Sequence, residues 1–392
     1  MSWSRVAAPC YRPELSAQAG AEPFMRLALI TPVYPPASGG GAYYSRQLAL
    51  GLAERNRIEH IAIYTEAFPG QPRGSRFVSD HVTISRVFPF RAGRDDKPWH
   101  RYLLYVWQNL QFVALPLWLP SSTTVLLVHG SFHHHPNFMV LAMHLLRRLR
   151  KGHLGLMADM RDPCLPNARF HELYPYDRII CCSESVVRHL EVDPQLKKKL
   201  VLIPIILDVT RPNTDTIASA LDRFGLADRP YLLSSNGISL KKRIDEAIDV
   251  TRRLRARGHN LALVVVGRRR DWQPRHQQAI DDGEMIYLGS VRNSDVLALA
   301  AGSELVINLS RIEAPSRASL EAIAVGARTL LPPNVPEFER ACPGYVASSS
   351  DPEVLADQVE TILRQPLSTN IYDLSLHSPE RVLPLYEQLF EC

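Results

Sequence analysis

Short runs of apolar residues alternate with amphipathic segments along the chain from Met25 onward. Runs such as residues 26–31, 125–129 and 261–266 are continuously apolar inside their ends (27–30, 125–128 and 261–266), which is typical of parallel strands covered on both faces. The segments between them repeat apolar residues at helical spacing, as Tyr44, Leu48 and Leu52 do. This alternation predicts an α/β protein built from doubly wound parallel sheets. The predicted strands span residues 26–31, 60–65, 81–88, 125–129, 154–160, 178–182, 199–204, 231–235, 261–266, 285–288, 304–309 and 328–331, and the predicted helices span 42–56, 102–115, 137–151, 244–257, 294–302, 316–325, 351–364 and 378–391.

The alternating pattern is interrupted once, by the polar and turn-rich segment 208–216. At 392 residues the chain is too long for one core, so we expect this segment to link two domains. The predicted boundaries are residues 25–207 and 208–377 for two Rossmann-like domains facing across a cleft, and 378–392 for a last helix that returns to the first domain. Residues 1–24 lack the apolar segment of a signal peptide, which predicts either a disordered tail or a translation start at Met25.

Net charge limits the kinds of partner that the protein is expected to bind, and cysteine usage indicates its cellular compartment. A net charge of +5 is too small to indicate nucleic acid, but it fits an anionic small ligand or an anionic membrane surface. The six cysteines show no CxxC spacing, which indicates a reducing, cytoplasmic location and no metal site.

One apolar segment, residues 102–120, approaches the length of a membrane span but is interrupted by Gln108, Asn109, Gln111 and Pro116. Its pattern favours a buried or half-buried helix. The alternative is a surface that lies on the inner face of a membrane, as in a peripheral membrane protein, with nearby cations facing lipid phosphates.

Three segments carry candidate chemistry. Two of them follow predicted strands, and one of these contains a run of glycines while the other contains a run of cations. In "TPVYPPASGGGAYY" the glycines Gly39, Gly40 and Gly41 precede a helix whose first amides could hold a phosphate, although a flexible turn is the alternative. In "SSNGISLKKRIDEAI" three cations stand at a helix start, where a bound anion would offset their unfavourable interaction with the helix dipole. A solvated basic turn is the alternative there.

The third segment, "SRIEAPSRASLEAIAVGART", places Glu313 before a predicted helix and Glu321 inside it. Carboxylates accept strong hydrogen bonds from hydroxyl groups, and amides at the helix start could hold phosphate or sugar oxygens. The segment therefore suits a polyhydroxylated, phosphorylated ligand.

Taken in order, these motifs resemble those of retaining glycosyltransferases with the GT-B fold, of the group 1, family 4 type. The resemblance covers residues 26–391 and rests on the two acids eight positions apart, "KKRID", "VVVG", "YLGSV", "PPASGGG" and the final helix. It implies transfer from a UDP- or GDP-sugar to a hydroxyl acceptor without a metal. Glu313 and Lys242 would then be catalytic, with Glu313 on the transferred sugar and Lys242 on the leaving diphosphate. The donor-binding residues would be Gly39, Gly40, Gly41, Lys241, Gly267, Ser316, Arg317 and Glu321, with Glu321 on the ribose.

The chain departs from the family pattern at several positions. Asn236-Gly237 stands where the family has Gly-Arg, "EAPS" replaces Glu-Gly-Phe-Gly, "PIILD" replaces the hinge pattern, and Arg161-Asp162 replaces a histidine. His129, Arg161 and Asp162 are the candidates for the acceptor side, and residues 133–135 add three histidines after the same strand as His129.

The resemblance implies a hexosyltransferase of polysaccharide or glycolipid biosynthesis, with a carbohydrate or lipid-linked acceptor. The alternative is a divergent, non-catalytic nucleotide-sugar-binding protein of the same fold. An epimerase of that fold is disfavoured by the two acids, and a dinucleotide oxidoreductase by the lack of GxGxxG.

Overall fold

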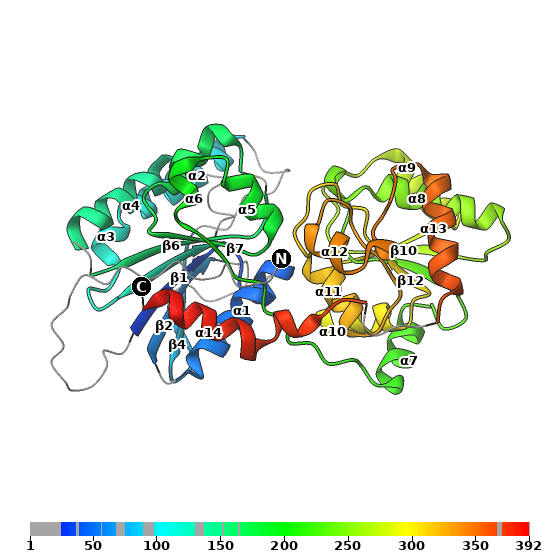
Figure 1. Ribbon diagram of the computed structural model, residues 1–392, viewed down its shortest axis with the longest axis horizontal. Coiled ribbons are helices and arrows are strands. Elements are labelled where there is room, and N and C mark those ends of the chain that lie inside the picture. The colour runs from blue at the N-terminus through cyan, green and yellow to red at the C-terminus, as the bar shows by residue number, and fades with distance from the viewer. Residues whose placement is uncertain are drawn as a thin grey trace. The chain divides into compact units, whose positions relative to one another are not determined.

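The computed structural model describes residues 25–36, 39–55, 57–67, 75–88, 98–129, 137–150, 153–163, 165–366 and 371–391. The tail predicted at residues 1–24 and the histidines at 133–135 lie outside these ranges. The chain divides into two compact units, the first formed by residues up to 206 together with 377–392, and the second by residues 207–376 (Figure 1).

The first unit is built on an eight-stranded sheet with the order β3-β4-β2-β1-β5-β6-β7-β8. All neighbouring strands pair in parallel except β3, which pairs antiparallel with β4. The strands are β1 (Met25–Thr31), β2 (Ile58–Glu66), β3 (Ser75–Ser79), β4 (Val82–Phe88), β5 (Val125–His129), β6 (Gly155–Met160), β7 (Arg178–Cys181) and β8 (Leu200–Leu202). The helices are α1 (Gly40–Ala53), α2 (Pro98–Val113), α3 (Leu115–Trp118), α4 (Asn137–Arg150), η2 (Asn167–Leu173), α5 (Glu184–Leu190), α6 (Pro194–Lys197) and α14 (Pro379–Phe390).

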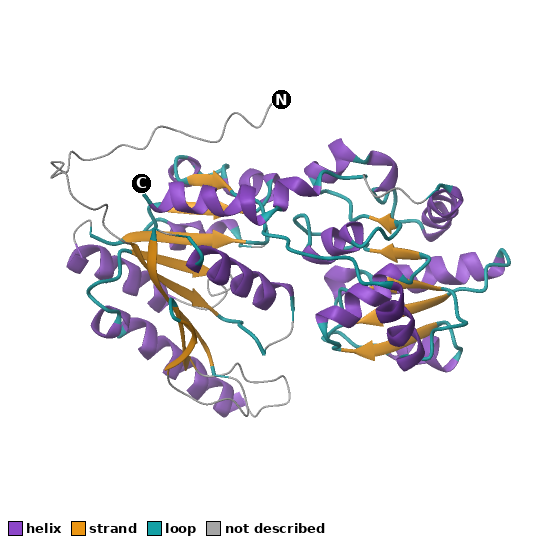
Figure 2. Cartoon of the chain, turned by 90° about the horizontal axis from the view of Figure 1, so that it is seen from below, coloured by secondary structure: helices purple, strands orange, loops and turns teal. Residues whose placement is uncertain are grey.

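Helices cover both faces of this sheet, as its strands' apolar character requires (Figures 1 and 2). Helix α14 packs on α1, and an added Cβ at Gly51 would lie 2.8 Å from a Leu383 methyl carbon. Val382 and Tyr386 of α14 join the buried cluster beneath α1. On the chain leading into α14, His377 Nδ1 lies 3.0 Å from the Ile205 carbonyl oxygen, so the two connections to the second unit run side by side.

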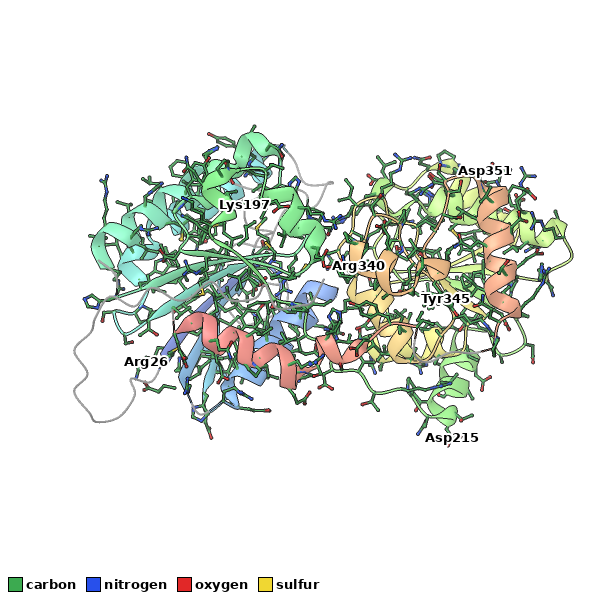
Figure 3. All side chains as sticks on the ribbon, in the orientation of Figure 1. Arg26, Lys197, Asp215, Arg340, Tyr345 and Asp351 are labelled. Atoms are coloured by element: carbon green, nitrogen blue, oxygen red, sulfur yellow. The ribbon has the colours of Figure 1, made fainter. Side chains whose placement is uncertain are left out.

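The second unit has a five-stranded sheet with the order β11-β10-β9-β12-β13, and every neighbouring pair is parallel. Helices α8 and α13 pack together over one apolar cluster, whereas α7, α10 and α11 cover a second cluster. Asp351 caps α13 by accepting a hydrogen bond from the Glu353 amide (Figure 3). The elements are β9 (Tyr231–Ser234), β10 (Ala262–Val266), β11 (Met285–Gly289), β12 (Leu305–Ile307), β13 (Thr329–Leu330), α7 (Thr214–Arg223), η3 (Leu240–Lys242), α8 (Ile244–Ala256), α9 (Pro274–Asp281), α10 (Asn293–Ala301), α11 (Arg317–Ala324), α12 (Pro336–Ala341), η4 (Pro343–Tyr345), α13 (Pro352–Arg364) and η5 (Leu374–His377).

The predicted fold class, two doubly wound parallel sheets, is confirmed. Three local features differ from the expected pattern. Helix α7 begins at Thr214, inside the predicted linker, because the Asn213 side chain accepts a hydrogen bond from the Thr216 amide and starts a helix there. Helix α1 begins at Gly40, so two of the three predicted loop glycines form its first turn. Strand β3 was not predicted, and it lies at the edge of its sheet.

Candidate active site

The two predicted catalytic residues follow neighbouring strands in the second unit. Strand β9 leads to Lys242, and β12 leads to Glu313. Strand order reverses between β9 and β12, since later strands continue on one side from β9 to β10 and β11, and on the other from β12 to β13. Ligands of open α/β sheets bind at the carboxyl ends of the strands where the order reverses. The topology therefore puts both residues at the expected binding edge.

Lys242 and Glu313 are in direct contact. The Lys242 ammonium lies 2.5 Å from Glu313 Oε2, and the side chains are only 13% and 8% exposed. A lysine ammonium has three N–H donors, so this contact leaves Lys242 able to donate to a second anion. The Lys242 ammonium can therefore bind a phosphate while it stays paired with Glu313.

Main-chain contacts hold the two segments in register. The Arg311 amide donates to the Lys241 carbonyl oxygen, which joins the loop carrying Glu313 to the turn carrying Lys242. Lys241 itself is exposed. The next residue, Arg243, has a φ of 54°, in the left-handed region, and its buried guanidinium binds Glu246. This sharp turn ends η3 and starts α8 immediately after Lys242.

A buried network around Asn308 supports the loop of Glu313, and sequence reasoning missed it. The Asn308 amide group donates to the hydroxyls of Ser316 and Ser319, at 3.1 and 2.9 Å. Its carbonyl oxygen accepts from the Ser310 amide and hydroxyl. The network closes the loop between β12 and α11 across its base. The available signal was a polar residue directly after a buried strand.

Ser316 caps helix α11 by accepting a hydrogen bond from the Ser319 amide, as its position before the helix allows. The amides of Arg317 and Ala318 occupy the first two helical positions, which have no partner within a helix. Amides at the first positions of a helix can donate to an oxygen of a phosphate or sugar.

Glu321 is buried in α11 and paired with an arginine from the same helix. Arg317 Nε donates to Glu321 Oε1 at 2.6 Å. Burial raises the pKa of Glu321, while the charge of Arg317 and hydrogen bonds from Arg317 and Asn293 act in the opposite direction. The predicted donor-binding residue Arg317 therefore presents its guanidinium to Glu321.

Gly267, a predicted donor-binding residue, lies where two backbone segments meet. A Cβ on Gly267 would lie 2.7 Å from the Gly237 nitrogen, and a Cβ on Gly237 would lie 2.6 Å from the Arg268 carbonyl oxygen. The Tyr287 hydroxyl donates to the Gly267 carbonyl oxygen, which fixes the ends of β10 and β11 relative to each other. Both glycines are needed for this close approach.

Gly237→Ala is expected to destabilise the protein by about 3 kcal/mol or more, because it adds a backbone clash to a left-handed conformation. Gly225→Ala is the matched control, since its φ of +66° nearly equals the +68° of Gly237 but nothing lies within 4 Å of its Cβ position. We expect the control to cost about 1 kcal/mol. Urea unfolding of both variants measures the difference, and equal losses would contradict the role given to close approach.

The predicted residues of the first unit also gather where its strand order reverses, between β1 and β5. Gly39, with a φ of +122°, precedes α1 and Gly40 begins it. A Cβ on Gly41 would lie 4.0 Å from His129 Nε2, so the first turn of α1 lies beside the end of β5. His129 is buried and pairs in register with Asp159 of β6.

Arg161 is engaged inside the first unit. Its Nη2 donates to Asp159 Oδ2 and to the Tyr386 hydroxyl, each at 2.8 Å, and its guanidinium lies 3.5 Å from the centre of the Tyr44 ring. These contacts join β6, α1 and α14. Burial raises the pKa of Asp159. The neighbouring candidate, Asp162, is half-buried in the turn after β6.

Metal ligation was not predicted for either unit. Within the described ranges, no group of three His, Cys, Asp or Glu side chains is arranged to hold a metal ion.

Comparison with known proteins agrees with this geometry. Residues 222–373 match the family model for glycosyl transferases group 1. Among solved structures, Anabaena HepE in complex with UDP-glucose has a TM-score of 0.68 at 13% identity, covering 94% of this chain and 100% of that one. Sucrose-phosphate synthase from Thermosynechococcus elongatus has a TM-score of 0.69 at 16% identity, covering 94% of this chain and 98% of that one. The trehalose 6-phosphate synthase from Burkholderia multivorans has a TM-score of 0.60 at 14% identity, with the same coverages of 94% and 98%. No curated protein sequence matches the chain.

The fold is thus that of the GT-B glycosyltransferases. The chain carries a group 1 glycosyltransferase domain, and Lys242, Glu313 and Glu321 all lie within the matched residues. The predicted resemblance is confirmed at this level, while membership of family 4 stays a prediction.

Proposed function

We propose that the protein transfers a sugar, with retention, from a nucleotide-diphosphate sugar to a hydroxyl acceptor. The observation that carries this proposal is the Lys242–Glu313 contact at the point of strand-order reversal in a group 1 glycosyltransferase domain. The acceptor we propose is a carbohydrate or a lipid-linked saccharide, in polysaccharide or glycolipid synthesis. A reducing, cytoplasmic location fits Cys181 and Cys342, which are buried free thiols.

In the proposed reaction the bond between the anomeric carbon and the diphosphate oxygen breaks. A bond from the acceptor hydroxyl oxygen forms on the same face of the sugar, and the hydroxyl proton passes to the leaving diphosphate. Negative charge grows on that diphosphate as it departs, and Lys242 would neutralise it. Glu313 holds the Lys242 ammonium and accepts a hydrogen bond from the sugar. Lys241 and the amides at Ser316 and Arg317 would bind further oxygens.

Glu321 would accept hydrogen bonds from the ribose hydroxyls. The likeness in fold to HepE, which was solved with UDP-glucose, favours a uridine nucleotide as the first donor to examine. Gly39, Gly40 and Gly41 are proposed as amide donors to the donor's phosphate, and His129 and Asp162 as contacts for the acceptor.

A melting experiment tests the proposal. UDP or GDP at 100 times its dissociation constant should stabilise the protein by about 2.7 kcal/mol. Release of diphosphate from the matching nucleotide sugar, in the presence of an acceptor, should follow. Absence of any shift with UDP-, GDP- and ADP-sugars would contradict the proposal.

A binding protein without activity is the second candidate. The observation that favours it is that the charges of the candidate site are paired with one another, Lys242 with Glu313 and Arg317 with Glu321. This candidate predicts nucleotide binding that depends on Glu321 but no diphosphate release with any donor and acceptor.

Nucleotide binding is expected to weaken as the pH falls. The loss should begin at a higher pH than it would if Glu321 had the ordinary pKa of a glutamate. Burial raises the pKa of Glu321, so this carboxylate is protonated early and loses its capacity to accept from ribose hydroxyls. The stability of the empty protein should respond to this group in the opposite direction. A raised folded-state pKa means that the folded state binds the proton more tightly, so acidification favours folding through Glu321.

Titration calorimetry with UDP between pH 5 and 8 measures the effect. Glu321→Gln should bind less tightly and lose the pH dependence, whereas Glu304→Gln, at a glutamate outside the proposed site, should keep it. An unchanged pH profile in Glu321→Gln would exclude Glu321 as the titrating group.

A further inference from the structure

Helix α2 of the first unit presents large apolar side chains to solvent. The exposed residues recur at helical spacing on one side of the helix, and they are Trp99, Tyr102, Leu103, Trp107 and Leu110. Trp107, for example, is 56% exposed. Isolated exposed apolar residues are ordinary, but a continuous row that includes two tryptophans marks an interaction surface.

The opposite side of α2 is already packed. Phe112 is fully buried and stacks on Phe88, with ring centres 4.9 Å apart. Gln111 Nε2 donates to the Val87 carbonyl oxygen, which attaches the helix to the end of β4. The helix therefore has one side that packs on the core and a second, exposed side that is also apolar. This is the half-buried helix that the sequence pattern favours.

The two neighbouring helices extend the apolar surface. Helix α4 contacts both α2 and α3, and the three lie together on one face of the sheet (Figure 1). Their exposed apolar residues are Leu117 of α3, which is 87% exposed, and Phe138, Leu141 and Leu149 of α4. We call the exposed side of α2, α3 and α4 the α2–α4 face.

The charge of this region has one sign. The sequence contains no aspartate or glutamate from residue 97 to residue 158. The last turn of α4 carries Arg147, Arg148 and Arg150. Arg147 pairs with Asp177, and Arg150 donates to the Leu119 carbonyl oxygen, while Arg148 is exposed beside Leu149. An apolar surface with aromatic residues and cations at its border complements a layer of lipid tails under anionic phosphates.

We propose that the α2–α4 face docks on an anionic lipid bilayer, with its tryptophans and leucines at the boundary between headgroups and acyl chains. No helix in the described ranges is long and apolar enough to cross a membrane, so the surface would lie on the bilayer. A second copy of the chain is the less favourable occupant, because a symmetric contact would bring the arginines of the two copies together. Docking of the α2–α4 face on lipid does not depend on which sugar donor the protein uses.

Vesicle co-sedimentation of the full chain tests this docking. Binding is expected to vesicles of phosphatidylcholine with 30% phosphatidylglycerol, and to weaken as salt is raised, because lipid charge contributes about 1 kcal/mol per cation. The Trp107→Gln/Leu110→Gln variant should bind about tenfold less tightly, since each exposed side chain removed loses apolar contact with the bilayer. Val354→Gln, at an exposed valine of α13, is the matched control and should bind as the wild type does.

The charge contribution is tested separately. Arg148→Gln should weaken binding about fivefold, and Arg364→Gln, at an exposed arginine of the second unit, should leave it unchanged. Brominated lipids should quench tryptophan emission, and Trp107→Phe should reduce the quenched fraction.

Equal binding to neutral and anionic vesicles, or unchanged binding by the Trp107/Leu110 variant, would overturn the proposal. So would a concentration-dependent dimer in light scattering that Trp107→Gln/Leu110→Gln abolishes, since that result would assign the face to a second copy. Circular dichroism and the melting temperature of each variant confirm that it is folded.

Discussion

Lys242→Met is expected to lower the turnover number for sugar transfer by about 100- to 1000-fold, the usual loss when one preorganised donor to a growing negative charge is removed. The ammonium is fixed by Glu313 on a turn that ends at the reversal of strand order, so no other described lysine occupies its place. The measurement is the rate of diphosphate release from the nucleotide sugar. Lys197→Met, at an exposed lysine of the first unit (Figure 3), is the matched control and should retain full activity.

Loss of folding must be separated from loss of catalysis in this variant. Lys242→Met leaves the buried Glu313 carboxylate without its cation and should cost about 2–3 kcal/mol, less than a completely buried pair. The double variant Lys242→Met/Glu313→Gln removes that unpaired charge. It should recover most of the stability and none of the activity. A double variant that transfers sugar at the wild-type rate would show that neither residue is catalytic.

Arg161→Ala is expected to lower the free energy of unfolding by about 3–5 kcal/mol, because it leaves Asp159 as an unpaired buried charge. It also removes the hydrogen bond to Tyr386 and the contact with the Tyr44 ring. Arg26→Ala breaks an exposed ion pair with Glu59 and should cost far less, because solvent screens exposed charges. Urea unfolding followed by circular dichroism measures both losses.

Acidification should restore part of the stability that Arg161→Ala loses. Burial raises the pKa of Asp159, and without Arg161 the folded state gains still more from protonating it. Stability of the variant should therefore rise as the pH falls, and the added change Asp159→Asn should remove that trend. If Arg161→Ala is no less stable than Arg26→Ala, the arginine is free to serve an acceptor instead.

Much of the fold follows from the sequence because parallel strands covered on both faces must be apolar throughout. The runs at residues 125–129 and 261–266 identify their strands almost to the residue. Strand β3 could not be found in this way, because a short edge strand such as "SRFVS" has no continuous apolar run. The polar segment at 208–216 suggested a linker, and Asn213 made part of it a helix cap instead.

The sequence names candidate residues for the site but not the contacts between them. The motifs named Lys242 and Glu313 separately, whereas their contact depends on strand order, which the sequence does not state. Asn308 went unnoticed because an amide after a strand is common, and its role comes from two serines on the next helix. The return of the last helix to the first unit was predicted, but not that its Tyr386 would meet Arg161.

That return has a consequence for synthesis of the chain. The second unit is one continuous segment, so its whole sequence is translated before α14 is made. The first unit, although translated first, lacks Tyr386 and the helix that covers α1 until the last residues emerge. Translation therefore begins with the first unit, but the second unit is the first whose sequence is complete. A chain that ended at residue 376 would contain the whole sequence of the second unit but only part of the first.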